Sequence, residues 1–216
     1  MWNKIIISPL YNSLQFFINY THDIGISIVL FTIAIKTLLL PLNISANKTT
    51  KNIKKIQPEI DKLKTKHKNS PRDLGVELSK MYKENQIKPF SGILAIFIQM
   101  PILFGLYQIL LKEIGNIQDK ITFFNIDVTK PNIILAVLTF ISMAYLMHIS
   151  SKDMTVSDGA SDFQKEFTKM MSLQMKYFLP AIVFITSIFL PAGLTLYFVV
   201  SNMFAIGQFF LLKKII

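Results

Sequence analysis

The sequence contains no cysteine, which excludes disulfide bonds and thiolate metal sites. Its three histidines are scattered, and it lacks the H-E-x-x-H, G-x-S-x-G and Walker motifs of zinc proteases, serine hydrolases and nucleotide-binding proteins. Charged residues make up only 17% of the chain. From these absences we expect no catalytic residue, no cofactor and no metal site, so the protein is not expected to be an enzyme.

Apolar residues are abundant instead, at 51% of the 216 residues with a mean hydropathy of +0.44. Soluble domains rarely reach this composition, and several apolar runs approach the roughly 20 residues that cross a bilayer as a helix. We therefore predict an all-α integral membrane protein. Its five transmembrane helices are expected at about 23–42, 92–111, 133–149, 177–190 and 192–212.

The N-terminal segment, residues 1–22, is expected to form an amphipathic helix in the extracytoplasmic membrane interface. Polar residues recur in it at the spacing of one helical face. They are Ser8, Asn12, Gln15, Asn19 and His22. A frayed N-terminus is the alternative.

Residues 43–88 form a basic block with 12 Lys or Arg against 5 Asp or Glu. Apolar residues repeat in two narrow seams, over 53–63 and 74–81, which predicts a cytoplasmic helical hairpin. Ser70 as N-cap and Pro71 at the first helical position mark the start of its second arm.

The fourth predicted span is short, because its 14 residues give a helix of about 21 Å against a hydrocarbon core of about 30 Å. Either this helix extends back through Met170 and Met171, or the bilayer is thinner beside it.

The distribution of cations predicts the topology. With residues 43–88 in the cytoplasm, 18 Lys or Arg lie on the cytoplasmic side and 4 on the other side. The positive-inside rule then places the N-terminus outside and the C-terminus in the cytoplasm. The net charge of +10 therefore indicates topology and not a nucleic-acid-binding surface.

Lys36 lies inside the first span, where a cation costs about 2.5–3.5 kcal/mol on insertion scales and is a candidate functional residue. All 13 Asp and Glu residues fall outside the apolar parts of the predicted spans, with Asp23 at the outer boundary of the first, so Lys36 has no obvious counter-ion within the membrane. Without a counter-ion, a water-filled cavity is the simplest way to keep the Lys36 ammonium charged. The alternative is that Lys36 snorkels, because about six residues, or about 9 Å of helix, separate it from the cytoplasmic end.

Other polar residues in the spans complete a candidate substrate groove with Lys36. They are Thr32, Gln99, Ser142, Tyr197, Ser201, Asn202 and Gln208. Spacing places Tyr197, Ser201 and Gln208 on one helical face. Any one of these residues could instead form an ordinary hydrogen bond between helices, and Gln99 could bond the backbone carbonyl that Pro101 leaves without a partner.

The order of these parts resembles the YidC/Oxa/Alb family of membrane protein insertases, in the short bacterial form without a periplasmic domain. The segments that carry the resemblance are Lys36 shortly before Leu-Pro-Leu, Gln57-Pro58-Glu59, MYKENQIKPFSG, IQMPILFGLY and PAGLTLYFVVSN. Together with the order of the helices, they extend the resemblance over nearly all of residues 1–212.

The resemblance implies five helices around a hydrophilic groove, open to the cytoplasm and to lipid but closed to the outside, in the bacterial plasma (inner) membrane. A nascent membrane protein would place its polar flank in this groove while its apolar segment enters the bilayer. Relatives usually carry arginine where this chain has Lys36, and lysine offers a point charge instead of a planar fork.

The partners we expect are nascent membrane proteins and the lipid bilayer, with residues 43–88 contacting the ribosome or the Sec translocon. We expect a monomer that recognises no nucleic acid sequence. The alternative function is a small channel or transporter subunit with Lys36 as an anion site, which requires a pore open on both faces. A structural assembly factor that holds other membrane subunits is a further alternative.

Overall fold

The computed structural model describes residues 8–68, 70–87, 91–113, 122–124, 126–151 and 162–215. These ranges are almost entirely helical, and one short antiparallel hairpin pairs β1 (Thr122–Phe123) with β2 (Ile126–Asp127). The packing of the helices divides the chain into two units, and each is described by itself.

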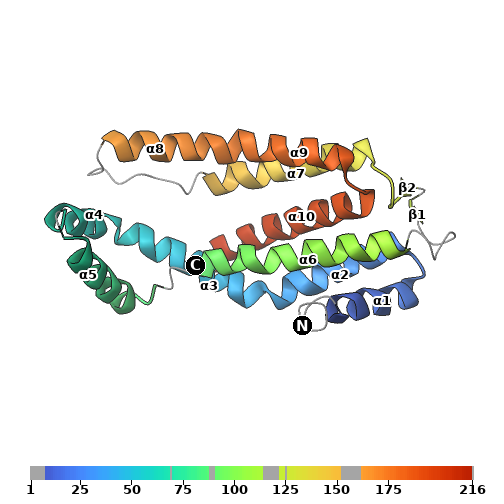
Figure 1. Ribbon diagram of the computed structural model, residues 1–216, viewed down its shortest axis with the longest axis horizontal. Helices are drawn as coiled ribbons and strands as arrows, with labels where there is room; N and C mark the ends of the chain where they lie inside the picture. Colours follow the sequence, from blue (N-terminus) through green and yellow to red (C-terminus); the bar gives the residue numbers. More distant parts are fainter. Residues whose placement is uncertain are drawn as a thin grey trace. The chain divides into compact units, whose positions relative to one another are not determined.

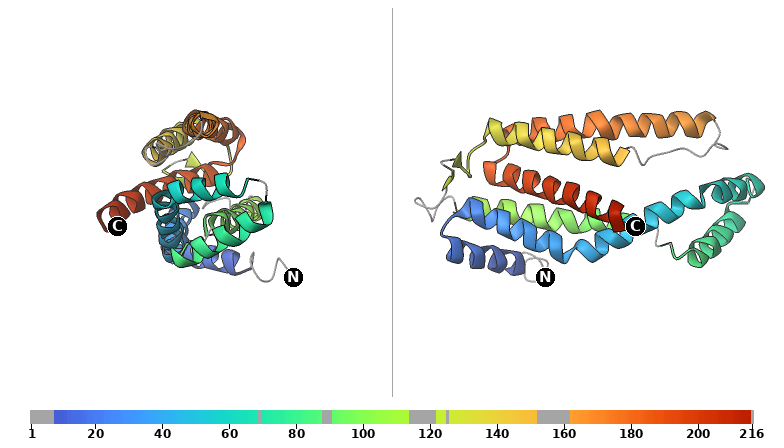
Figure 2. Two further views of the ribbon diagram at one scale, coloured as in Figure 1. Left: turned by 90° about the vertical axis from the view of Figure 1, so that its left-hand side faces the viewer. Right: turned by 180° about the vertical axis from the view of Figure 1, so that it is seen from behind.

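The first unit is a helical bundle with α10 (Ala192–Ile215) at its centre (Figures 1 and 2). α10 packs against α2 (Ile24–Leu38) and against α7 (Ile133–Ser151), while α9 (Leu179–Phe189) packs on α7 and α1 (Ser8–Thr21) packs on α2. The β-hairpin, the π-helical turn η2 (Gln174–Phe178) and the part of α6 (Ser91–Glu113) from Ile98 onward complete this unit.

Three helices of the described chain are long and apolar enough to cross a membrane, at Ile133–Ser151, Lys169–Phe189 and Ala192–Lys214. A fourth span results if Ile24–Leu38 and Leu40–Ile53 count as one broken helix. The described part of α6 adds a shorter apolar helix at Phe97–Leu110. The chain is therefore a helical protein with several membrane-spanning helices, and the count of five stays a prediction.

The helix that contains the fourth predicted span extends back through Met170 and Met171, because the apolar helix begins at Lys169 and has 21 residues. At 1.5 Å per residue it is about 32 Å long, which matches an ordinary hydrocarbon core. Its length therefore gives no reason to expect a thinner bilayer.

The first predicted span, 23–42, does not form one continuous helix. α2 stops at Leu38, and α3 (Leu40–Lys55) begins two residues later with Pro41 in its first turn. Proline is tolerated there because the first N–H groups of a helix have no partner within the helix. Pro41 therefore lies at the start of a helix and not at the end of one.

The second unit contains α3, α4 (Gln57–Lys66), α5 (Pro71–Glu84) and α8 (Asp162–Leu173). Its apolar core is formed by Ile56, Ile60 and Ile87, against which Leu78 and Met81 of α5 pack. α5 begins at Pro71 with Ser70 as N-cap, as the sequence predicts, but the Ser70 hydroxyl donates to Asp73 Oδ2 (2.6 Å) and not to the backbone.

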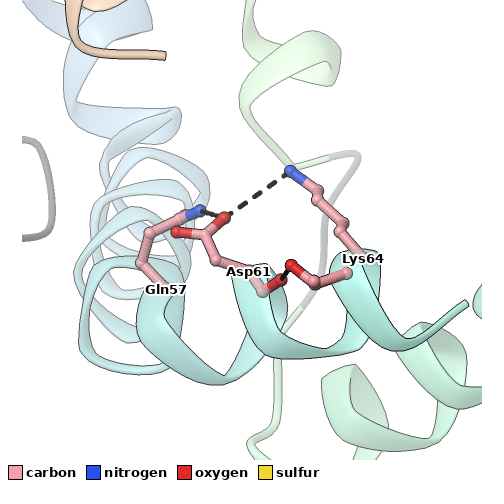
Figure 3. A network of polar contacts seen from close by, with 4 residues as sticks. Gln57, Asp61 and Lys64 are labelled. Atoms are coloured by element: carbon pink, nitrogen blue, oxygen red, sulfur yellow. Dashed lines mark hydrogen bonds and ion pairs between the residues drawn. The ribbon is translucent and has the colours of Figure 1, made fainter. Parts of the chain in front are cut away.

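Polar contacts form within α4 and between the end of α4 and the middle of α5. Asp61 Oδ1 accepts a hydrogen bond from Gln57 Nε2 (3.0 Å) and lies 4.0 Å from Lys64 Nζ (Figure 3). Glu77 of α5 lies 3.3 Å from His67 Nε2 and 3.8 Å from Lys66 Nζ. The lysine pairs are exposed and of modest geometry, so the apolar core contributes more to the stability of this unit.

Candidate functional site

A chain of two hydrogen bonds links Lys36 to the centre of the bundle. Lys36, in the last turn of α2, donates from Nζ to Gln99 Oε1 of α6 at 3.4 Å. Gln99 Nε2 in turn donates to the Tyr197 hydroxyl of α10 at 2.6 Å. Three helices that are distant in sequence therefore meet at one polar contact.

Pro101 offers the Gln99 side chain an alternative hydrogen-bond partner within α6. Pro101 follows it within α6 and leaves one backbone carbonyl of the preceding turn without its usual partner. The hydrogen bonds of the Gln99 side chain nevertheless go to Lys36 and Tyr197. The Lys36 ammonium likewise bonds across to another helix, which differs from the simple snorkelling alternative.

A second polar contact joins α7 to another face of α10. Asn202 Nδ2 donates to Ser142 Oγ at 3.1 Å, and Ser142 Oγ donates to the Thr139 carbonyl at 3.0 Å. Thr139, fully buried, donates to the Thr195 carbonyl at 3.2 Å. These groups satisfy one another between helices, which is the ordinary use of polar residues in a membrane bundle.

The remaining predicted groove residues are nearly or fully buried. Thr32 is fully buried and its hydroxyl donates to the Ile28 carbonyl of its own helix at 2.6 Å, so it does not reach Lys36 through a hydrogen bond. Ser201, one turn after Tyr197, and Gln208 are each less than one-tenth exposed. The structure thus brings Lys36, Gln99 and Tyr197 together, and separately Ser142 and Asn202.

The end of the bundle that holds the β-hairpin is closely packed. Phe123 of β1 lies against Gly25 in the first turn of α2, where any Cβ would overlap the Phe123 side chain. Gly193, in the first turn of α10, is nearly as crowded, because a Cβ there would come within 3.0 Å of Leu110 and 3.1 Å of Ile28. Close approach leaves no room for a Cβ at Gly25, whereas at Gly193 the Leu110 and Ile28 methyl groups would have to shift by a few tenths of an ångström.

The same end is tied together by backbone hydrogen bonds. Ala192 N–H donates to the Lys130 carbonyl and Gly193 N–H to the Val128 carbonyl, each at 2.8 Å. The first N–H groups of a helix otherwise lack partners, so the segment after β2 caps α10. Val128 is fully buried beneath this connection.

Sequence reasoning missed several residues of this arrangement. Thr139 lies three residues before Ser142 in an apolar span, so the same search for intramembrane polar residues could have included it. Phe123 and Val128 carry no such signal, because they belong to a segment of mixed charge that reads only as a loop. Their role depends on which residues they pack against in the folded chain.

The fold and the site define a helical membrane protein that holds a cation among neutral polar side chains. A family model described as the 60Kd inner membrane protein matches residues 16–216. The chain belongs to this family. Its relatives are named as membrane protein insertases, which are not enzymes.

Three relatives show how completely the chain aligns. The membrane protein insertase YidC of Fusobacterium nucleatum is 32% identical over 217 residues, covering 96% of this chain and 99% of the relative. YidC of Clostridium tetani is 36% identical over 199 residues, with coverage of 91% and 84%. YidC 2 of Bacillus anthracis is 32% identical over 222 residues, with coverage of 99% and 81%.

A solved structure shares the fold. It is titled "Active YidC insertase crystal structure with the first transmembrane domain resolved" and superposes with a TM-score of 0.62 at 23% identity. The match covers 96% of this chain and 46% of that chain, so the present chain spans about half of its length.

Proposed function

We propose that this protein inserts nascent membrane proteins into the lipid bilayer by receiving their polar flanks in a groove that contains Lys36. The observation that carries the proposal is the contact of Lys36 with the neutral Gln99–Tyr197 pair. In the described chain no carboxylate lies within 4.0 Å of the Lys36 ammonium. A cation that keeps its charge inside an apolar bundle can lower the cost of bringing polar residues into the membrane.

The groove we propose is centred on Lys36, Gln99 and Tyr197, opens to the cytoplasm and lipid, and is closed to the outside. The other predicted groove residues, Thr32, Ser142, Ser201, Asn202 and Gln208, lie in the helices around it. Lys36 lies near the cytoplasmic end of α2, whereas the Gly25–Phe123 and Gly193–Val128 contacts lie at the opposite end. These contacts support closure on the outer side. The 18 to 4 distribution of cations supports an outer N-terminus and a cytoplasmic C-terminus in the bacterial inner membrane.

The basic residues 43–88 are proposed to receive clients or to contact the ribosome or the Sec translocon from the cytoplasm, with the protein working as a monomer. Deletion of residues 50–84 should then lower insertion while leaving the first unit folded. Insertion at the wild-type level after this deletion would remove the proposed role of these residues.

Complementation of insertase-depleted cells tests the role of Lys36. Lys36→Arg should restore insertion, whereas Lys36→Ala and Lys36→Glu should fail for at least some clients. Lys169→Ala is the matched control, because it removes one exposed lysine of α8, outside residues 43–88, and should behave as wild type. Complete rescue of every client by Lys36→Ala would exclude the groove charge from the mechanism.

Site-specific crosslinking from position 36 to a stalled nascent membrane protein separates the alternatives. An insertase gives a crosslink that appears while the client is short and disappears on its release. A stable crosslink that persists after release of the client would favour an assembly factor. Ion or solute flux through liposomes without any client would favour a channel.

A further inference from the structure

The two hydrogen bonds of the Lys36–Gln99–Tyr197 chain differ in length. The Gln99–Tyr197 bond, at 2.6 Å, is short, whereas the Lys36–Gln99 bond, at 3.4 Å, is near the limit of a hydrogen bond. Gln99 is thus held firmly by Tyr197 and loosely by Lys36. The position of the Gln99 side chain is therefore set mainly by Tyr197, and Lys36 makes the weaker of its two hydrogen bonds.

Gln99 bridges Lys36 and Tyr197 through the two ends of its amide. A glutamine amide has one accepting oxygen and one donating nitrogen, whereas an ammonium has only donors. Lys36 Nζ can therefore bond only to Oε1, which leaves Nε2 to donate to the Tyr197 hydroxyl. Without the tyrosine hydroxyl the amide loses the short hydrogen bond that holds its oxygen beside the ammonium.

Among the described residues, the Lys36 ammonium has one hydrogen-bond acceptor, Gln99. Lysine has three N–H donors, and Gln99 accepts from one of them. No carboxylate of the described chain lies within ion-pair distance of Nζ, so its charge is not neutralised there. A neutral, long hydrogen bond restrains the position of the ammonium without competing strongly against a new acceptor.

We propose that Gln99 and Tyr197 are positioning residues that together form a fixed, neutral and weak resting acceptor for the Lys36 ammonium, which a carbonyl or carboxylate oxygen of the entering client displaces. This inference rests on the proposed insertase function for the identity of the displacing group. The resting contact itself is a property of the protein without a client. The balance between holding and releasing Lys36 is set by Gln99 being an amide and not a carboxylate.

The resting contact can be measured in the purified full-length protein by acylating lysines with a small amine-reactive ester. Mass spectrometry then gives the rate at Lys36 relative to the exposed Lys51 of the same sample. Gln99→Met and Tyr197→Phe should each raise this rate about threefold or more, as loss of a weak hydrogen bond predicts. The double variant should rise no further than either single one, because both remove the same contact.

Gln99→Glu should have the opposite effect. A carboxylate facing Lys36 forms a charge-assisted bond, so acylation should fall about tenfold or more. Insertion should also fall further with Gln99→Glu than with Gln99→Met, because the client must then displace an ion pair. Thr186→Ala is the matched control, since it removes an exposed hydroxyl that bonds only to carbonyls of its own helix α9 and should leave acylation of Lys36 unchanged.

Additive effects of Gln99→Met and Tyr197→Phe, or an unchanged rate in both, would overturn the positioning role. Gln99→Met keeps this test valid even if Tyr197→Phe fails to fold. If the acylation pattern is found but neither the wild type nor any variant inserts a client, the proposed function is wrong and the resting contact is still supported. If insertion works but Gln99→Glu inserts as well as Gln99→Met, displacement by the client is wrong.

Discussion

Phe123, in β1, lies against Gly25 of α2 so closely that even a methyl group on Gly25 would overlap the Phe123 side chain. The contact joins a two-residue strand to the first turn of a membrane-spanning helix. It leaves no room for any other residue at position 25 unless the strand moves.

Gly25→Ala should therefore destabilise the protein by about 1–3 kcal/mol, as expected for overpacking. The measurement is the thermal or denaturant midpoint of the purified protein in detergent. Gly207→Ala in α10 is the control, because no atom lies within 4 Å of its added Cβ and alanine favours a helix. Phe123→Gly, which removes the Cβ nearest to position 25, should relieve the cost of Gly25→Ala in the double variant, and equal loss in both backgrounds would contradict the steric explanation.

Stability at acid pH should depend on Asp127. Desolvation raises the pKa of its carboxyl, but hydrogen bonds from the Thr129 side chain and backbone and the nearby Lys130 ammonium outweigh this and hold the pKa below its ordinary value. A carboxylate with a lowered pKa stabilises the fold above its unfolded value of about 3.9, and this contribution is lost as the pH falls through the folded value.

The wild type should thus lose more stability than Asp127→Asn between about pH 5 and pH 2. The difference should stay below about 1 kcal/mol, because the carboxylate is partly exposed and screened by water. Thermal midpoints of the two proteins across this pH range give the comparison. Parallel curves would mean that Asp127 contributes nothing to acid stability.

The Ser142–Asn202 contact between α7 and α10 should stabilise the bundle by about 0.6 kcal/mol, the average for interhelical hydrogen bonds in membranes. Ser142→Ala and Asn202→Ala should each lower stability, and the double variant should lose less than the sum of the two. A double-mutant cycle on the unfolding free energy measures the coupling. Strict additivity would show that the pair does not act as one contact.

Ile60→Ala should loosen the second unit by about 2–5 kcal/mol, because Ile60 is only 3% exposed in the small Ile56–Ile60–Ile87 core. Hydrogen exchange should become faster in α4 and α5 and remain unchanged in α7 and α10. Val76→Ala is the control, since Val76 is 50% exposed and its truncation removes little packing. Equal effects of the two substitutions would contradict the assignment of this core.

The sequence was most informative where a polar residue interrupts an apolar run. Polar residues within apolar runs identified Lys36, Gln99, Tyr197, Ser142 and Asn202, because hydrocarbon makes each of them costly. Local rules also located the start of α5 at Pro71. The quoted sequence segments, together with the order of the helices, were sufficient to indicate the family to which the chain belongs.

The pairing of these residues was not predictable in the same way. Spacing puts Thr32 one turn from Lys36, yet its hydroxyl bonds to its own helix. Gln99 and Tyr197 are 98 positions apart, and nothing local specifies that they meet. The packing at the end of the bundle that holds the β-hairpin was even less predictable from the sequence, because Phe123 fits there only where Gly25 has no side chain.

The central position of α10 has a consequence for the biogenesis of the protein itself. α10 follows α2, α7 and α9 in the chain, and it supplies Tyr197 to the site and the N–H groups that Val128 and Lys130 cap. During translation, the earlier helices must therefore wait in the membrane with their α10-facing surfaces uncovered. The Gln99–Tyr197 contact and the capping of α10 by the Val128 and Lys130 carbonyls can form only after this last described helix has been synthesised.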